Sequence, residues 1–366
     1  MIIDCALYRD GRRQHRDKMA LSDAARRCTE GGFVWLGLFE PDQSELAEVA
    51  AAFGLHELAV EDAQTFHLRP KVEEYEEGFH LVILRTARYD PAKSEVEFGE
   101  ISVFIGHNFV ITVRQGAASE LHGARERLES RPKLLGLGTQ SVLWAILDQV
   151  IDSYTPVVAE LEKDIDEVEA LVFSGAVAPT ERIYFLRREV SDFWRAVHPL
   201  LSATTILERG RWAEELTPYF RDVRDHLHLV NEEVTAQREL LATILEANMA
   251  VISVEQTKVS VRQSAFMEQL TIMSTVFLPL TFVTGFFGQN FEWLVGNVAS
   301  ATAFVVFGLG GLAIPCVGLY TWFRMRMARR RATLPVAQHV HDPAVRIANE
   351  EPADAPRFVG QRVHDR

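Results

Sequence analysis

Two stretches without a charged residue constrain the fold of this 366-residue chain more than any other feature. Residues 270–287 and 301–323 contain no Asp, Glu, Lys or Arg, whereas residues 1–263 have the mixed charge of a soluble protein. Each stretch is close to the ~20 residues that an α-helix needs to cross a bilayer. The alternative is two buried helices of a large soluble core, which the arginine cluster after the second stretch disfavours. The sequence therefore predicts two membrane-spanning helices that follow a large soluble region.

The distribution of positive charge predicts the orientation of the two helices. Five arginines between positions 324 and 331 follow the second stretch, while the connection at 288–300 holds one charge, Glu292. Because positive residues gather on the cytoplasmic side of membrane helices, we expect both termini in the cytoplasm. Residues 1–12 lack the basic start and apolar core of a signal peptide, so the soluble region is expected to stay in the cytosol. The predicted location is the cell (inner) membrane, with more than one pass.

Charge and cysteine content narrow the function classes. The formal net charge is -13, and nucleic-acid partners are disfavoured because a phosphate-binding protein needs a basic surface. Cys5, Cys28 and Cys316 lie far apart in the sequence and predict neither a disulfide framework nor a zinc site. No zinc-protease, phosphate-loop or nucleophile-elbow motif is present, so we do not expect an enzyme.

Short apolar segments separated by turn residues predict a cytosolic α/β domain at residues 1–135. The expected strands are residues 33–38, 79–89, 101–105 and 109–113, with helical spacing at residues 43–53 and 56–65. The last two strands flank Gly106-His107-Asn108, which is typical of a hairpin.

Longer helices are expected after this domain. Apolar residues at three- and four-residue steps, interrupted at Ser174-Gly175 and Pro179, predict an antiparallel helical hairpin at 136–215. A single helical pattern then continues to position 287, first as a cytosolic stalk at 216–265 with an imperfect heptad repeat, which indicates packing against other copies. The remaining segments are a first transmembrane helix at 266–288, an external loop at 289–299, a second transmembrane helix at 300–323, and a basic cytosolic end with a disordered tail at 324–366.

One face of the first transmembrane helix is small or mildly polar. Its positions, three and four residues apart, are Ser264, Met267, Thr271, Ser274, Leu278, Thr281, Gly285 and Gly288. Two interpretations remain open. Small residues allow membrane helices to pack closely, and hydroxyls with backbone carbonyls can line an ion pathway. A single helix lines a pore only when several copies surround it.

The end of this helix carries a family resemblance. Residues 271–291 read TIMSTVFLPLTFVTGFFGQNF and are similar to the pore helix and signature loop of the CorA family of metal ion transporters. That family closes the helix with Gly-Met-Asn, and here Gly288, Gln289 and Asn290 stand in that place. Residues 61–75 and 219–226 also resemble the family, in a cytosolic segment and at the stalk entry. The resemblance covers about residues 33–326.

The resemblance implies an α+β membrane protein that assembles as a homopentameric funnel around a central pore. Each subunit would have a cytosolic α/β domain, a long helical hairpin and a very long stalk helix that continues into the first of two transmembrane helices. By position, Asn290 would form the outer ring that meets the hydrated ion. Gly288, Gly285 and Thr281 match a wider polar stretch, Leu278, Leu270 and Met267 a hydrophobic constriction, and Ser264 its cytosolic side.

The same resemblance implies regulation by the transported ion. Glu61, Asp62 and Asp222 match family positions that bind Mg2+ between neighbouring cytosolic domains and hold the channel closed. The implied function is passive influx of Mg2+ or Co2+, with hydrated divalent cations, the lipid bilayer and other copies as partners and no organic cofactor. Two alternatives remain open, a Zn2+ transporter of the same family and a membrane-tethered metal sensor that does not conduct.

Overall fold

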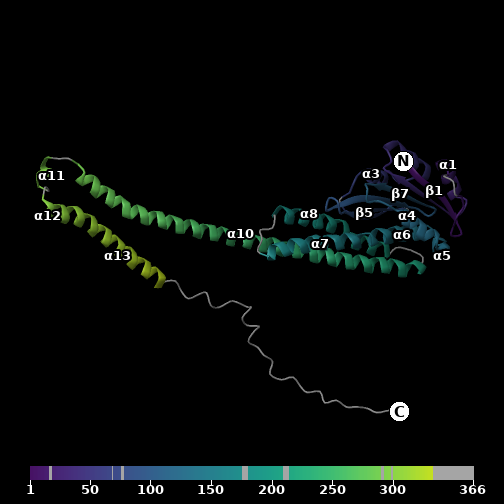
Figure 1. The fold of residues 1–366 in the computed structure, drawn as a ribbon. Helices are drawn as coiled ribbons and strands as arrows, with labels where there is room; N and C mark the ends of the chain where they lie inside the picture. The colour runs from purple at the N-terminus through teal and green to yellow at the C-terminus, as the bar shows by residue number, and fades with distance from the viewer. Residues whose placement is uncertain are drawn as a thin grey trace, which may run out of the picture. The chain divides into compact units, whose positions relative to one another are not determined.

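The computed structural model describes residues 1–15, 19–67, 69–75, 78–174, 180–208, 214–289, 292–297 and 300–332. It divides into two compact units, Met1–Gln256 and Thr257–Arg366, and each is described by itself. The first unit combines a mixed β-sheet with helices on both of its faces (Figure 1). The soluble α/β region that the sequence predicts is therefore confirmed, while the finer segment boundaries stay predictions.

The sheet has seven strands in the order β2-β1-β3-β7-β6-β5-β4. Their bounds are β1 (Ile2–Arg9), β2 (Arg12–Arg13), β3 (Phe33–Phe39), β4 (Lys71–Glu74), β5 (His80–Asp90), β6 (Glu95–Ile105) and β7 (Phe109–Gln115). β3 and β7 pair in parallel and every other neighbouring pair is antiparallel. The four expected strands and the β6–β7 hairpin are present, whereas β1, β2 and β4 were not expected.

Both faces of the sheet are buried, and this explains the long apolar runs of its strands. Leu81 and Ile83 of β5 belong to one core with α1 (Leu21–Cys28), α2 (Gln43–Phe53) and α3 (Glu57–Gln64). Val82 and Leu84 point to the other face, because successive strand side chains alternate. That second core is formed with the later helices.

The later helices of the first unit are α4 (His122–Glu129), α5 (Pro132–Leu135), α6 (Thr139–Asp152), α7 (Tyr154–Phe173), α8 (Thr180–Val197), α9 (Leu200–Glu208) and the 3-10 turn η2 (Glu214–Leu216). α7 and α8 lie side by side (Figure 1), as expected for the helical hairpin. The helix α10 (Thr217–Phe287) contributes its beginning to the same core. Its buried residues there are Phe220, Val223, Leu227, Val230, Val234, Leu241 and Ile244, spaced to lie on one helix face.

In the second unit the apolar residues of α10 are exposed. Among the described residues, one segment is long and apolar enough to cross a membrane, by length and composition alone. It is Glu214–Phe286, and none of its most apolar stretch is buried. Pro279 lies inside this helix and removes one backbone donor from it.

The second expected membrane span is helical but not uniform. It follows α11 (Glu292–Asn297) and consists of α12 (Ala301–Ala303), the π-helical turn η3 (Phe304–Leu309) and α13 (Gly310–Ala332). Such π-helical turns interrupt the regular hydrogen-bond ladder of an α-helix. Gly308, Gly310 and Gly311 lie in or directly after this turn.

Candidate metal-binding and pore residues

The short helix α3 carries two of the three carboxylates expected to bind a regulatory metal ion. The Nδ1 atom of His56 accepts a hydrogen bond from the Leu58 amide at 3.3 Å and caps its first turn. Ala59 and Ala63 are fully buried against the sheet, so the helix is held by small side chains. Glu61 is exposed and Asp62 is half-buried.

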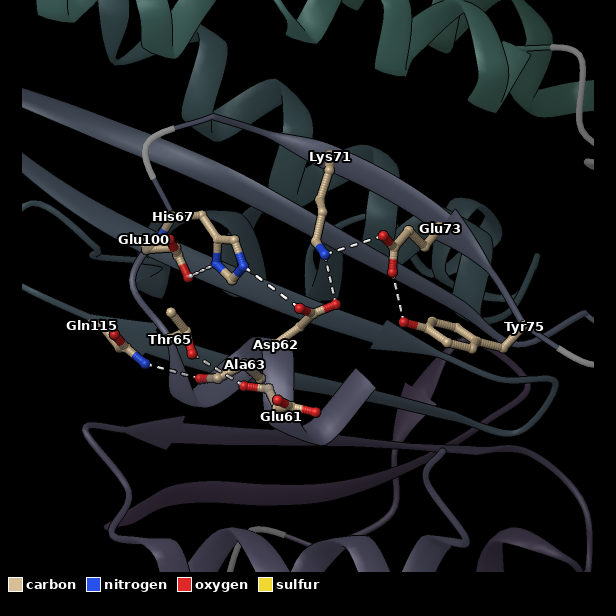
Figure 2. Close-up of polar contacts among 10 residues, drawn as sticks. All are labelled: Glu61, Asp62, Ala63, Thr65, His67, Lys71, Glu73, Tyr75, Glu100 and Gln115. Carbon is tan, nitrogen blue, oxygen red and sulfur yellow. Dashed lines mark hydrogen bonds and ion pairs between the residues drawn. The ribbon is translucent and has the colours of Figure 1, made fainter. Parts of the chain in front are cut away.

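Asp62 forms a charged cluster with residues that follow it in the chain (Figure 2). The Nζ atom of Lys71 donates to Asp62 Oδ2 at 2.6 Å and to Glu73 Oε1 at 3.1 Å. The hydroxyl of Tyr75 donates to the other oxygen of Glu73 at 2.6 Å. His67 Nε2 lies 3.7 Å from Asp62 Oδ1. The carboxylate of Asp62 therefore already has a cationic partner within its own chain.

The two carboxylates of this cluster favour the protonated, charged form of Lys71. Burial lowers the pKa of Lys71, but the hydrogen bonds with Asp62 and Glu73 outweigh burial and raise it above its ordinary value. Burial and the hydrogen bond with Glu73 raise the pKa of Tyr75, so this phenol stays protonated and donates. Lys71 remains a permanent positive charge beside Asp62 across the physiological range.

A buried pair of opposite charges fixes the backbone between α3 and β4. The carboxylate of Glu100 accepts from the His67 amide at 2.5 Å, and Arg85 Nη1 donates to the His67 carbonyl at 2.9 Å. Arg85 and Glu100 lie opposite each other on β5 and β6. The Arg85 guanidinium also stacks on the rings of Phe66 and Phe98, at 5.0 and 4.5 Å. Both polar groups of the His67 backbone are thereby held.

Burial is the main influence on the pKa values of Glu100 and Arg85. It raises the pKa of Glu100, whose side chain is 1% exposed, although the His67 amide and ring lower it. It also lowers the pKa of Arg85. We did not predict either residue as part of a site. The sequence signal that could have found them is a charged residue next to an apolar run within a strand. Such a residue is expected to be buried, and a buried charge needs a partner.

Asp222 interacts with residues outside this cluster. It is in the second turn of α10, its side chain is 65% exposed, and its nearest ionisable partner is His226 Nε2 at 4.0 Å. Throughout the described part of the chain, no three His, Cys, Asp or Glu side chains converge to hold a metal ion. Within one chain the structure brings Asp62 together with Lys71 and His67, and does not bring Glu61, Asp62 and Asp222 together.

The expected pore residues lie on the exposed part of α10. Ser264, Met267, Leu270, Thr271, Ser274, Leu278, Thr281 and Gly285 are all within the helix, and Leu278 is 76% exposed. Thr271 and Thr281 donate to the carbonyls of Met267 and Phe277, both at 2.8 Å. These internal bonds satisfy the hydroxyl donors, as a helix in an apolar solvent requires. The structure is compatible with both a packing face and a pore face.

The signature residues follow the end of the helix. The Gly288 amide donates to the Thr284 carbonyl at 2.9 Å, and the Gln289 amide to the Phe286 carbonyl at 3.3 Å. Gln289 is exposed. Asn290, the residue expected to meet the hydrated ion, lies outside the described residues.

Comparison with known proteins finds relatives that agree with the resemblance seen in the sequence. A family model described as CorA-like Mg2+ transporter protein matches residues 30–330. The putative metal ion transporter YfjQ of Bacillus subtilis is 29% identical over 295 residues, 80% of this chain and 88% of that protein. The cobalt/magnesium transport protein CorA of Thermotoga maritima is 27% identical over 267 residues, 71% of this chain and 74% of that protein.

A solved structure gives the same result at the level of the fold. The full-length CmaX protein matches with a TM-score of 0.62 at 23% identity, covering 90% of this chain and 98% of that one. The resemblance noted in the sequence is thereby confirmed, apart from the Gly-Gln-Asn detail of the signature, which stays a prediction.

Proposed function

We propose, from the premise that this chain belongs to the CorA-like Mg2+ transporter family, that it conducts Mg2+ into the cytosol as a homopentamer. The observation that carries the proposal is the family match over residues 30–330, which includes most of the first unit and the apolar part of α10. Co2+ is a second proposed cargo, because the Thermotoga maritima relative is named a cobalt/magnesium transport protein. The proposed location is the inner membrane of the cell. The proposed topology has two membrane spans with both termini in the cytoplasm.

The proposed pore wall is the small and polar face of α10, repeated in each copy around the axis. Mg2+ dehydrates reluctantly, and amide oxygens of Asn290 can accept hydrogen bonds from its water shell without replacing that shell. Below this ring, Thr281 and Ser274 offer hydroxyl oxygens, while Leu278, Leu270 and Met267 form constrictions that gate by excluding water. Gln289 adds a second amide at the mouth.

Mg2+ is favoured over Zn2+ by the ligand types on this face. Residues 264–290 contain no His or Cys, the nitrogen and sulfur ligands that Zn2+ prefers over oxygen. Oxygen donors suit a hard cation that keeps its water.

The proposed driving force is the membrane potential. Two positive charges that move through ~100 mV gain about 4.6 kcal/mol. This gain is sufficient for inward accumulation, and no ATPase motif is found in the sequence.

The proposed regulation uses Glu61, Asp62 and Asp222 as oxygen ligands for cytosolic Mg2+. Because the described residues of one chain provide no converging ligand set, the ion would bridge α3 of one copy and α10 of the next. Carboxylates brought together in this way repel one another unless a divalent ion lies between them. Bound Mg2+ would therefore favour the closed arrangement, and its loss would shift the population toward open states.

The test is competitive uptake into liposomes that hold the purified protein, with an inside-negative potential. We expect Mg2+ flux that Co2+ reduces and that a proton gradient does not alter. Flux no greater than that of empty vesicles, or flux of Zn2+ without Mg2+, would contradict the proposal.

A further inference from the structure

Lys71 holds two carboxylates at once in the cluster next to α3. Its Nζ atom is 2.6 Å from Asp62 Oδ2 and 3.1 Å from Glu73 Oε1, and both Lys71 and Asp62 are largely shielded from solvent, at 28% and 27% exposed. Figure 2 shows the ammonium between the two carboxylates, on the side of Asp62 that does not face His67. Ion pairs in such partly desolvated positions are screened less than pairs on the surface.

The three groups are held in place by separate contacts. Lys71 belongs to β4 and lies opposite Ile83 of β5 in the ladder. Glu73 is oriented by the Tyr75 hydroxyl at 2.6 Å. Asp62 is fixed by the packing of its helix through Ala59 and Ala63. Because the partners are already oriented, little additional side-chain entropy opposes the ion pair.

A divalent cation that binds Asp62 has to displace this ammonium or share the carboxylate with it. A carboxylate that already has an opposite charge at hydrogen-bond distance presents a weaker field to a second cation, and the remaining ammonium repels that cation directly. Removal of the ammonium would leave Asp62 and Glu73 as two unneutralised acceptors that face one space. The local charge would change from -1 to -2, and a divalent ion would compensate it best.

We propose that Lys71 is a built-in competitor of the regulatory divalent cation. It neutralises Asp62 when the ion is absent and raises the Mg2+ concentration at which the ion binds. This inference rests on the proposed regulatory role of Asp62. The lysine thereby sets the range of cytosolic Mg2+ over which the protein responds, and it prevents Asp62 from repelling neighbouring acids when Mg2+ is scarce.

The chain offers a matched control in Lys93. This lysine also pairs with two carboxylates, Asp90 and Glu97, at 2.9 Å each, in the hairpin that joins β5 and β6. Neither carboxylate is a proposed metal ligand. Substitution of Lys93 removes the same charge and the same number of ion pairs without a change at Asp62.

The experiment measures the melting temperature of the purified full-length protein in detergent as a function of Mg2+ concentration. Ligands that bind only the folded state raise the melting temperature with concentration, and this rise begins near the dissociation constant and does not saturate. The Mg2+ concentration at which the rise begins therefore reports the affinity independently of transport. Each variant is judged by this onset concentration and not by its melting temperature without Mg2+. Protection from chymotrypsin at the same Mg2+ concentrations gives a second reading.

We expect Lys71→Gln to lower the Mg2+ onset concentration about fivefold, the equivalent of one partly exposed ion pair. Lys71→Met should do the same, Lys71→Arg should keep the wild-type onset concentration, and so should Lys93→Gln. An unchanged or higher onset concentration in folded Lys71→Gln or Lys71→Met protein would overturn the inference. So would an equal shift in Lys93→Gln, or the absence of any Mg2+ response in the wild type. Failure of the proposed transport would appear separately, as missing Mg2+ flux in wild-type vesicles.

Discussion

The two halves of α10 have the same secondary structure and opposite environments. Between Phe220 and Ile244 a face of the helix is buried in the core of the first unit, with Leu227 completely buried. From Val259 to Phe286 most apolar side chains are exposed and none is buried, and Phe266, Phe277 and Leu278 are each about two-thirds exposed or more. An apolar residue is stable in the first half because its own chain covers it. In the second half the described residues of the chain do not bury the most apolar stretch, and the proposed cover is lipid or other copies.

This comparison separates two kinds of residue. In the buried half, contacts within the chain explain why a residue is needed. In the exposed half, contacts within a single chain do not explain why a residue is needed. The proposed role of each residue there depends on the membrane and on the proposed assembly.

The largest effect is expected at the outer mouth. Asn290→Ala should reduce Mg2+ uptake at least about a hundredfold, as loss of a preorganised polar group at a rate-determining site does, because the alanine cannot accept from the water shell of the ion. The measurement is uptake in liposomes, with the size of the assembled protein checked by light scattering. Asn297→Ala, a matched amide-to-methyl change in α11, should retain uptake. Wild-type uptake by Asn290→Ala protein would remove this residue from the ion pathway.

In the buried half, Leu227→Ala should destabilise the protein by about 2–5 kcal/mol, since it leaves a cavity in a packed core. Leu229 is 58% exposed on the same helix two residues later, and Leu229→Ala should cost less than about 0.5 kcal/mol. Denaturant unfolding of both variants, followed by circular dichroism, measures the difference. Equal losses of stability would show that burial by the chain itself does not distinguish the two positions.

The acidic ligands should affect sensitivity to Mg2+ more than stability. Asp62→Asn combined with Asp222→Asn should raise the cytosolic Mg2+ concentration needed for half inhibition by about tenfold, a typical allosteric coupling. Asp225 on the same helix is 63% exposed, and Asp225→Asn is the matched control that should keep the wild-type value. Currents from patches exposed to graded Mg2+ give the measurement. An unchanged inhibition curve for the double variant would refute the regulatory role.

The smallest effect is expected where α8 packs against the sheet. Burial, and then the acids Glu95, Asp164 and Asp192, raise the pKa of Glu189 to about 7, although the Val96 amide donates to this carboxylate at 3.2 Å and lowers it. Because the folded pKa lies above the unfolded one, the wild type is stabilised at low pH and loses this stability between about pH 4.5 and 7.

Glu189→Gln removes this dependence and keeps an acceptor for the Val96 amide. After allowance for solvent screening, the variant should be more stable than the wild type by about 1 kcal/mol at pH 8 and no more stable at pH 4. Thermal melts across this pH range provide the test. A stability difference that does not vary with pH would contradict the account.

The parts of the fold that local periodicity determines were predictable from the sequence. The apolar runs of β5 and β6 result from burial on both faces of the sheet, and the three- and four-residue spacing at the beginning of α10 results from burial on one face, so each leaves a recognisable pattern. β1 and β4 were not expected. β4 is four residues long and three of its four side chains are charged, so its pairing with β5 determines its conformation more than its own composition does.

The candidate site was predictable only in part, because its central contacts join residues that no local pattern connects. Lys71 meets Asp62 through the return of the chain from α3 to β4, and Arg85 meets Glu100 through the register of a hairpin. The resemblance implied that Asp62 is a metal ligand, which stays a prediction, and it gave no indication of the partner lysine. The π-helical turn η3 in the second apolar stretch also depends on backbone geometry that composition does not encode.

Thiol labelling determines whether the small and polar face of α10 lines the ion path. In protein whose three cysteines are replaced by serine, Ser274→Cys and Val276→Cys place a thiol on this face and, about 200° around the helix, away from it. Mg2+ uptake into liposomes is measured before and after treatment with a membrane-impermeant cationic thiol reagent. The account predicts block of the Ser274→Cys protein and unchanged uptake by the Val276→Cys protein. Unaltered uptake by the treated Ser274→Cys protein, with block of Val276→Cys, would contradict it.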